Sequence, residues 1–437
     1  MLAIFGFACV AAILFLIMSK KMTPLVSLVL VPLIFCILLG KGDFIGDYVK
    51  NGVTKVAVNG VMYMFSILFF GLMRDNGAFD PVVKGIVKFM GGNPVLVVIG
   101  AYTIALIGHL DGAGATTFLL ACPVMMPIFE SLKMSNMVLC CVVAMGAGIM
   151  NMVPWGGQVN RASVALGLDL MEIYRPLMLP QIMGILSGYG IAFYLGVKEK
   201  RRLTAAGLLV EGHFPSEQIG FQSTEFELSL RRPKLYPINL AILLTTIAIM
   251  MTGVIIPAAT FIVAACLTML INYRSPELQR KLVSYHAPEC MMIAGVLFAA
   301  GVMSGILTET GMIGAMSDVL IRAIPESLVR YSALIFGFFA MPLTLIFDTD
   351  AFYYGVLPVI ANSVGRFGVP PTDIARAFLT GLHTIGFPIS AFSAAIWLLI
   401  SLCKVELGDL QKFAFKWLWL MSLVVLFGCF ITGVFVL

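Results

Sequence analysis

Long apolar stretches run through almost the whole chain, separated by short polar or glycine-rich segments. A helix needs about 17 to 25 apolar residues to cross a bilayer, and most of these stretches reach or approach that length. The expected crossings are residues 2–18, 22–40, 57–73, 94–109, 136–150, 176–196, 237–254, 256–272, 287–306, 329–347 and 412–437. Residues 372–384 and 385–403 form either one interrupted crossing or two partial crossings. The pattern predicts an all-α polytopic membrane protein with about ten to twelve transmembrane helices.

Two shorter segments are amphipathic rather than uniformly apolar. Residues 80–90 and 313–324 alternate apolar side chains with Lys88 and Arg322, respectively. A helix with one apolar and one charged face lies along the membrane surface and does not cross it. We therefore expect both segments to lie in the interface between lipid and water.

The composition agrees with a membrane protein and excludes other classes. Hydrophobic residues make up 60% of the 437 residues, whereas charged residues make up only 12%. Soluble globular proteins carry about a quarter charged residues, because their surfaces face water. The low charge content excludes a secreted or cytosolic enzyme, an intrinsically disordered protein and a nucleic-acid-binding protein. Lipid is the solvent for most of this surface.

One long polar segment, residues 197–236, divides the chain into an N-terminal part, 1–196, and a C-terminal part, 237–437. Short loops rich in lysine and arginine stay on the cytoplasmic side of a membrane. The basic residues of this segment are Lys198, Lys200, Arg201, Arg202, Arg231, Arg232 and Lys234. We therefore expect a basic cytoplasmic linker between two membrane-embedded halves.

The two halves resemble each other at a constant offset of 234 residues. The matching pairs are Gly71 and Gly305, Asp75 and Glu309, Gly77 and Gly311, Lys88 and Arg322, and Pro154 and Pro388. Lysines precede the crossing 22–40, whereas basic residues follow its counterpart, 256–272. If both basic clusters are cytoplasmic, the two crossings run in opposite directions. This is the pattern of an inverted repeat, which is common in secondary transporters.

Each half contains an acidic, glycine- and proline-containing segment, at about 108–128 and about 346–365, which we expect to form a re-entrant hairpin. The first carries Asp111, and the second carries Asp348 and Asp350. A carboxylate at membrane depth costs at least roughly 2.5 kcal/mol, so it faces a water-filled cavity, a cation or a proton path. Alternatively, Asp111 and Asp350 cap the N-terminus of a half-helix.

A broken helix follows each hairpin, at about 136–163 and about 372–395. The interrupting residues are Pro154, Gly156, Gly157, Gly386 and Pro388. A break frees backbone groups from the helical hydrogen-bond pattern, which is tolerated at this depth only around a cavity or inside packed protein. Freed amides at a helix N-terminus bind anions, whereas freed carbonyls and nearby carboxylates suit cations.

Several polar residues near the breaks have two interpretations each. Arg161 either recognises a carboxylate through its planar guanidinium or extends to the lipid headgroups. His109 and His383 either relay protons or are packing residues. Further candidate hydrogen-bond donors to a ligand are Asn151, Thr384 and Ser390, together with Thr116 and Thr117 of the first hairpin.

Motifs of other functional classes are absent from the sequence. It contains no Walker-type phosphate loop, no His-Glu-x-x-His pair and no Gly-x-Ser-x-Gly elbow. These absences argue against an ATP-driven pump, an intramembrane metalloprotease and a serine hydrolase, respectively. Two broken-helix pairs that meet at acidic and small polar residues predict a carrier and not an enzyme.

At four segments the chain resembles the citrate–metal–proton symporter family (CitMHS) of the ion transporter superfamily. These segments are HLDGAGATTF at 109–118, NMVPWGG at 151–157, FDTDAFYYGVLP at 347–358 and TIGFPIS at 384–390. The resemblance implies import of citrate as a complex with a divalent cation, Mg²⁺ or Ca²⁺, by proton symport across the bacterial cytoplasmic membrane. It also implies a homodimer, an elevator-type movement of a transport part and no resident cofactor.

The resemblance assigns roles to most of the candidate residues that follow, whereas Arg161, His109 and His383 are candidates because of their own chemistry. Residues expected to bind substrate are Gly112, Gly114, Thr116, Thr117, Asn151, Pro154, Gly156, Gly157, Arg161, Thr384, Gly386, Pro388 and Ser390. Residues expected near the metal or in proton coupling are Asp111, Asp348, Asp350, His109 and His383, of which the three aspartates are the candidate metal ligands. One difference stands out: members of the family often have Asp-Gly-Asp-Gly in the first hairpin, whereas this chain has Ala113.

Two other functions remain open from the sequence. Carbonyl-lined helix breaks also suit Na⁺, so the chain is alternatively a Na⁺-coupled carrier of another di- or tricarboxylate. A protein of a different class, a gated anion channel, would also use helix N-termini to bind anions. No motif that we recognise encodes the choice of cation, the coupling ion and its stoichiometry, or the preference among tricarboxylates.

Overall fold

The computed structural model describes residues 1–208, 224–252, 254–321 and 326–435. These residues are helical throughout, with connecting turns and no β-strand. Seven of the described helical segments are long and apolar enough to cross a membrane, and further apolar helices of 10–17 residues accompany them. The prediction of an all-α polytopic membrane protein is confirmed.

The first half contributes ten α-helices. They are α1 (Leu2–Met18), α2 (Pro24–Leu38), α3 (Ile45–Asp75), α4 (Asp80–Met90), α5 (Pro94–Gly108), α6 (Gly114–Ser131), α7 (Asn136–Met150), α8 (Gly157–Leu166), α9 (Leu170–Tyr174) and α10 (Met178–Ala205). Short 3₁₀ turns precede α3, follow α5 and precede α10; these are η1 (Gly42–Phe44), η2 (His109–Asp111) and η3 (Arg175–Leu177). The amphipathic segment expected at 80–90 is α4.

The second half starts with the short helix α11 and continues to α21. Its helices are α11 (Glu225–Leu230), α12 (Tyr236–Thr252), α13 (Pro257–Asn272), α14 (Pro276–Glu309), α15 (Met312–Ile321), α16 (Glu326–Val329), α17 (Ser332–Leu343), α18 (Leu357–Gly365), α19 (Pro371–Leu379), α20 (Ala394–Cys403) and α21 (Leu407–Ile431). Between them lie η5 (Pro233–Leu235), the π-helical turn η6 (Ala351–Val356) and η7 (Phe387–Ile389).

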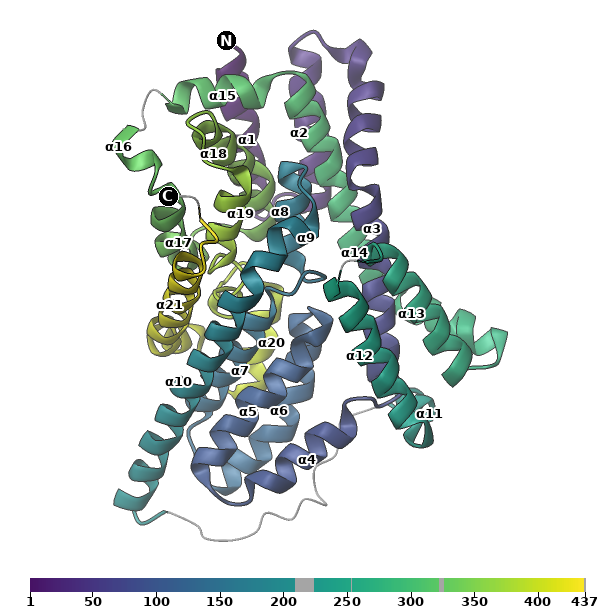
Figure 1. Ribbon diagram of the computed structural model, residues 1–437, viewed down its shortest axis with the longest axis vertical. Helices are drawn as coiled ribbons and strands as arrows, with labels where there is room; N and C mark the ends of the chain where they lie inside the picture. The colour runs from purple at the N-terminus through teal and green to yellow at the C-terminus, as the bar shows by residue number, and fades with distance from the viewer. Residues whose placement is uncertain (209–223, 253, 322–325, 436–437) are drawn as a thin grey trace.

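The packing of the hairpins and broken helices follows a reciprocal pattern. In the order of elements, α18 of the second half corresponds to α6 of the first, and α20 corresponds to α8. The hairpin helix of each half packs against the broken helix of the other: α6 contacts α20, and α18 contacts α8. Figure 1 shows α5 and α6 in the lower part of the molecule and α15 and α18 in the upper part. This reciprocal arrangement supports the expectation of an inverted repeat.

The two longest helices, α3 and α14, pack along each other and with α2 and α13 (Figure 1). Glycine permits the close approach, because a Cβ on either Gly52 or Gly305 would lie 3.0 Å from the Cα of the other. Near one end of the pair, His286 Nε2 lies 2.8 Å from Asp75 Oδ2, and both side chains are buried. We refer to α2, α3, α13 and α14 together as the long-helix group.

Several elements differ in length from the sequence prediction. Helices α3 and α14 extend well beyond the expected crossings 57–73 and 287–306, since their polar ends continue the helix past the apolar run. Helix α6 has 18 residues, despite Pro123 and Pro127, and is long enough by length and composition to cross a membrane. The re-entrant course of the first hairpin therefore stays a prediction.

The linker 197–236 is more structured than a solvated connection. Its first residues continue α10 to Ala205. Its last residues dock on the end of α3, where the Arg231 guanidinium lies 2.7 Å from Asp80 Oδ2 and the Arg232 amide donates to Asn76 O. Residues 209–223, like Arg322 of the second amphipathic segment, lie outside the described residues.

Candidate functional site

A cavity of about 170 Å³ lies where the first hairpin, both helix breaks and the long-helix group meet. Polar and charged side chains line it from several elements that are far apart in the sequence. The lining residues are Tyr63, Ile67, Asp111, Gly112, Ala113, Gly114, Asn151, Trp155, Gly157, Gln158, Arg161, Glu289, Ile293, Phe387, Ser393 and Ala395. We refer to this space as the central cavity.

Three helices begin at the central cavity. They are α6, α8 and α20, and their N-cap residues are Ala113, Gly156 and Ser393. None of these caps makes a side-chain hydrogen bond to its helix, so amide groups of the first turns stay free to bind a ligand. The amides of a helix N-terminus and the helix dipole both attract negative charge. The backbone alone therefore makes this cavity a candidate site for an anion.

The tip of the first hairpin is held by a network around Asp111. Asp111 Oδ1 accepts the Ala113 amide at 2.8 Å, and Oδ2 accepts the hydroxyl of Thr116. Gly112 has a left-handed backbone (φ +73°), and a Cβ there would lie 3.2 Å from Gly156 Cα. Asp111 therefore closes the turn that precedes α6 and is not itself the N-cap of that helix, which is Ala113; the same side chain also lines the central cavity.

Hydrogen bonds connect the first hairpin with both helix breaks. His109 Nδ1 lies 2.7 Å from Thr117 Oγ1, and its Nε2 lies 3.4 Å from Asn151 Oδ1. Asn151 Nδ2 in turn donates to His383 O at 2.8 Å. His109 is fully buried, and both of its ring nitrogens are engaged. Asn151 reaches the wall of the central cavity.

Aromatic residues join the first break to the long-helix group. The Trp155 indole donates to Leu110 O at 2.6 Å, and its ring stacks on Phe70 of α3 with centroids 5.5 Å apart. Tyr63, also of α3, donates its hydroxyl to Gly156 O at 3.0 Å. Pro154 lies in the same non-helical turn, residues 151–156, between α7 and α8.

Arg161 lies in the wall of the central cavity and does not extend to the lipid headgroups. Its Nε lies 2.6 Å from Asp350 Oδ1, so α8 of the first half is joined by an ion pair to the second hairpin. A Cβ on Gly157 would lie 2.5 Å from Arg161 Nη1, which shows how closely the guanidinium crosses the start of α8. Asp348 instead caps the helix that follows it, because its Oδ1 accepts the amides of Asp350 and Ala351.

The polar residues of the second break are buried behind the central cavity. His383 has a left-handed backbone (φ +52°) and donates its amide to Thr344 Oγ1, and its Nε2 lies 2.8 Å from Phe347 O. Thr384 and Ser390 donate to backbone carbonyls of Leu379 and Thr344, respectively. Their hydroxyl protons are therefore engaged within the protein.

The predicted site residues thus fall into two groups. Those that line the central cavity are Asp111, Gly112, Gly114, Asn151, Gly157 and Arg161. Those that support it from behind or lie in the second half of the site are His109, Thr116, Thr117, Pro154, Gly156, Asp348, Asp350, His383, Thr384, Gly386, Pro388 and Ser390. The three candidate metal ligands do not converge, and the described residues contain no cluster of three or more histidine, cysteine or acidic side chains that could hold a metal ion.

Glu289 and Tyr63 are among the residues of the cavity wall that the sequence interpretation missed. Glu289 of α14 lines the central cavity and lies near enough to Asp111 to interact with it electrostatically. Tyr63 of α3 lines the same space. Glu289 does carry a signal in the sequence, because it is an acidic residue within the expected crossing 287–306, where charge is expensive. Nothing in the sequence distinguishes Tyr63 from other aromatic residues.

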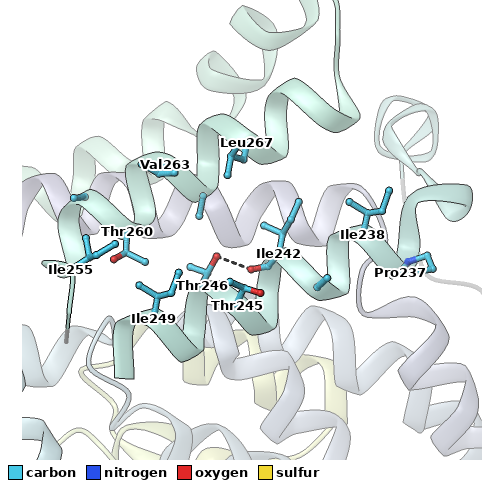
Figure 2. Close-up of a pocket in the computed structure, with 13 residues that line it drawn as sticks. Pro237, Ile238, Ile242, Thr245, Thr246, Ile249, Ile255, Thr260, Val263 and Leu267 are labelled. Atoms are coloured by element: carbon cyan, nitrogen blue, oxygen red, sulfur yellow. Dashed lines mark hydrogen bonds between the residues drawn. The ribbon is translucent and has the colours of Figure 1, made fainter. Parts of the chain in front are cut away.

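A different cavity, of about 510 Å³, lies between α12 and α13 and has an apolar character (Figure 2). Isoleucines and other aliphatic side chains line it, and it contains no acidic or basic residue. Two of its threonines are bonded within their own helices, because Thr246 Oγ1 donates to Ile242 O at 2.7 Å and Thr260 Oγ1 donates to Ile256 O at 3.3 Å. This groove suits lipid chains and not an anionic solute.

Comparison with known proteins decides the family. The profile of the citrate transporter family (CitMHS) matches residues 13–381. The chain belongs to the citrate transporter family. It is 35% identical over 420 residues to a citrate transporter of Bacillus subtilis (strain 168), a match that covers 95% of both chains. It is also 35% identical, over 421 residues and 95% of both chains, to the Mg(2+)/citrate complex secondary transporter of the same organism.

Solved structures support the fold of this citrate transporter family member. The YdaH transporter of Alcanivorax borkumensis superimposes with a TM-score of 0.58 over 90% of this chain and 88% of that chain, at 12% identity. The Neisseria gonorrhoeae MtrF efflux pump gives a TM-score of 0.57 over 90% of this chain and 85% of that chain, also at 12% identity. These two structures bear on the fold alone. Membership of the citrate transporter family, together with the apolar helices, identifies the protein as a multi-pass membrane transporter, consistent with the plasma membrane, and the resemblance seen in the sequence is confirmed.

Proposed function

We propose that this protein is a secondary active transporter that imports citrate as a complex with a divalent cation, by proton symport. The observation that carries the proposal is the central cavity, where three uncapped helix N-termini and Arg161 meet Asp111 and Glu289. A site that contains both positive and negative elements suits a substrate that is itself an anion bound to a cation.

The anionic part of the substrate would contact the amides of α6, α8 and α20. Citrate at neutral pH is a trianion, and one divalent cation reduces it to a monoanion. Removing charge before entry lowers the cost of desolvation, which is steep for isolated charges. The Arg161 guanidinium adds planar donors that match a carboxylate, and its pairing with Asp350 keeps it in place while the cavity is empty.

The cationic part would lie nearer to Asp111 and Glu289, which enter the cavity from the hairpin and from α14, respectively. Oxygen ligands suit both Mg²⁺ and Ca²⁺. Because the described residues offer no complete metal cluster, the cation would keep citrate oxygens and water as most of its ligands. In this view the ion is cargo and not a resident cofactor. The relative named as an Mg(2+)/citrate complex transporter supports this interpretation.

For transport, we propose an elevator-type movement of the hairpin-bearing helices against the long-helix group, in a homodimer. The polar contacts that would have to break include those of Tyr63 with Gly156 O and of Asn59 with Ser163 Oγ, which join α3 to the first break and to α8. Rigid-body movement of one group of helices around a central site is the usual behaviour of carriers built from repeats.

The experiment is radiolabelled citrate uptake by the full chain in proteoliposomes, with Mg²⁺, Ca²⁺, Na⁺ and pH varied independently. We expect uptake to require a divalent cation, to proceed without Na⁺ and to accumulate citrate when the outside is more acidic. Uptake that depends on Na⁺ and not on a divalent cation would favour the Na⁺-coupled carrier. Equilibration without accumulation under any gradient would favour an anion channel.

A further inference from the structure

A third cavity, of about 500 Å³, lies between the α6–α7 loop, the end of α10 and the start of α21. Its lining is divided into a cationic mouth and an apolar interior. Lys133, Lys198 and Arg202 form the mouth, whereas Met134, Val138 and Leu195, together with Phe413, form the interior. It is separate from the central cavity, with which it shares no lining residue.

The cationic mouth is held in a fixed shape by the buried carboxylate of Glu199. Glu199 Oε1 accepts the Ser135 amide at 2.7 Å and Arg202 Nη2 at 2.6 Å, which compensates its charge. Arg202 Nη2 also donates to Lys133 O at 2.7 Å, at the residue where α6 ends in a left-handed turn (φ +56°). The end of α10 and the α6–α7 loop are therefore joined beneath the mouth.

The two lysines add positive charge that the protein does not neutralise. Within the described residues, neither the Lys133 nor the Lys198 ammonium is paired with a carboxylate, and both side chains are exposed. Glu130, the nearest acidic residue in sequence to Lys133, pairs with Lys404 at 2.7 Å. Because Glu199 neutralises Arg202, the mouth carries the net positive charge of the two lysines.

The position of the cavity along α10 matches the surface of the membrane. Lys198 lies just beyond the expected crossing 176–196, and Leu195 lies one turn closer to the membrane interior. Further inward, Tyr194 packs against Trp417 of α21 with ring centroids 5.5 Å apart. Tyrosine and tryptophan concentrate where the headgroups meet the acyl chains. From mouth to interior, the cavity therefore passes from charged to apolar surroundings, and the aromatic pair lies next to its inner end.

We propose that this cavity binds the headgroup of an anionic phospholipid from the cytoplasmic leaflet, with its phosphate between Lys133 and Lys198 and its acyl chains along Val138, Leu195 and Phe413. The positive charge of the mouth suits the phosphate. The apolar interior suits the acyl chains, and a soluble anion has no such chains. Basic pockets between helices on the cytoplasmic side bind acidic headgroups by the same chemistry. The positive-inside rule places the end of α10 on that side.

The test is native mass spectrometry of the detergent-solubilised full chain with phosphatidylglycerol or phosphatidylcholine of the same acyl chains. We expect wild type to retain phosphatidylglycerol preferentially, and the pair Lys133→Gln/Lys198→Gln to bind it about tenfold more weakly, as expected for the loss of two surface cations. The matched control is Lys200→Gln/Arg201→Gln, which removes the same charge from exposed positions of α10 that do not line the cavity. It should bind like wild type.

Three results would overturn the proposal. One is equal weakening in both variant pairs, which indicates general attraction to the basic end of α10. Another is equal retention of the two lipids by wild type. The third is displacement of bound phosphatidylglycerol by citrate or inorganic phosphate, which indicates a site for soluble anions. If the double variant does not fold, judged by its elution from size exclusion, each single lysine variant should still show about a threefold loss, and no loss in either would reject the site.

Discussion

At the scale of the residue, the Arg161–Asp350 ion pair joins the two halves of the chain beside the central cavity. The two atoms Nε and Oδ1 lie 2.6 Å apart, and the side chains are only 20% and 12% exposed. A charge that loses its partner in such surroundings is costly, whereas removal of both charges is far less so. The pair therefore fixes the Arg161 guanidinium in the wall of the central cavity and also links α8 with the second hairpin.

We predict that Arg161→Gln and Asp350→Asn each destabilise the protein by up to about 3 kcal/mol, and that the double variant loses less than the sum. Thermal unfolding in detergent measures all three. Arg366→Gln is the control, because its pair with Asp318 is about half exposed and should contribute at most about 1 kcal/mol. Additive losses would show that the two side chains do not interact.

Glu289 gives a prediction about the cation. Because it faces the same cavity as Asp111, Glu289→Gln removes one of the two acidic groups that would lie near the divalent ion. The Mg²⁺ concentration for half-maximal citrate uptake should rise by about tenfold, which corresponds to about 1.4 kcal/mol. The control is Glu309→Gln at the exposed end of the same helix. An unchanged Mg²⁺ dependence in Glu289→Gln would place the cation elsewhere.

At the scale of the element, the first hairpin depends on a close approach of its tip to the first break. Gly112 is left-handed, and a Cβ there would press on Gly156. Gly167, which ends α8, is also left-handed (φ +66°), but nothing lies within 4 Å of the position of its Cβ. A comparison of variants at the two glycines therefore separates the effect of the left-handed backbone from the effect of contact with the first break.

We predict that Gly112→Ala and Gly167→Ala each cost about 1 kcal/mol in stability from the left-handed backbone, and that Gly112→Ala costs more. Citrate uptake should fall strongly only in Gly112→Ala, because only that change moves the hairpin tip away from the amides of α8. Uptake and thermal unfolding are measured on the same preparations. Equal uptake by the two variants would show that the hairpin contact is unimportant for transport.

The sequence predicted the helices of this fold better than the geometry of its site. Apolar runs and the glycines and prolines of 108–128 and 151–163 are local signals, so the positions of the breaks follow from the sequence alone. The pairing of Arg161 with Asp350 does not, because it joins residues from different halves. Whether Thr384 and Ser390 face a ligand or a carbonyl likewise depends on how the second break folds back on Thr344. Such contacts between distant parts of the chain cannot be inferred from length and composition.

At the scale of the whole molecule, the central cavity exists only because both halves meet there. The first half supplies α6, α8 and Asp111, and the second supplies α20 and Glu289. Reciprocal packing of α6 with α20 and of α18 with α8 brings these helix ends together. A single half would have neither the full set of N-termini nor both acidic groups. The packing of the two halves is therefore the reason that the site lies at the centre.

The most direct test of this account is calorimetric titration of citrate into the purified full chain, with and without Mg²⁺, for wild type, Arg161→Gln and the exposed control Arg366→Gln. We predict that wild type and Arg366→Gln bind citrate only when Mg²⁺ is present, and that Arg161→Gln binds at least about tenfold more weakly, as expected for a lost charged hydrogen bond. Binding of citrate by Arg161→Gln with the affinity of wild type would contradict the assignment of the central cavity as the substrate site.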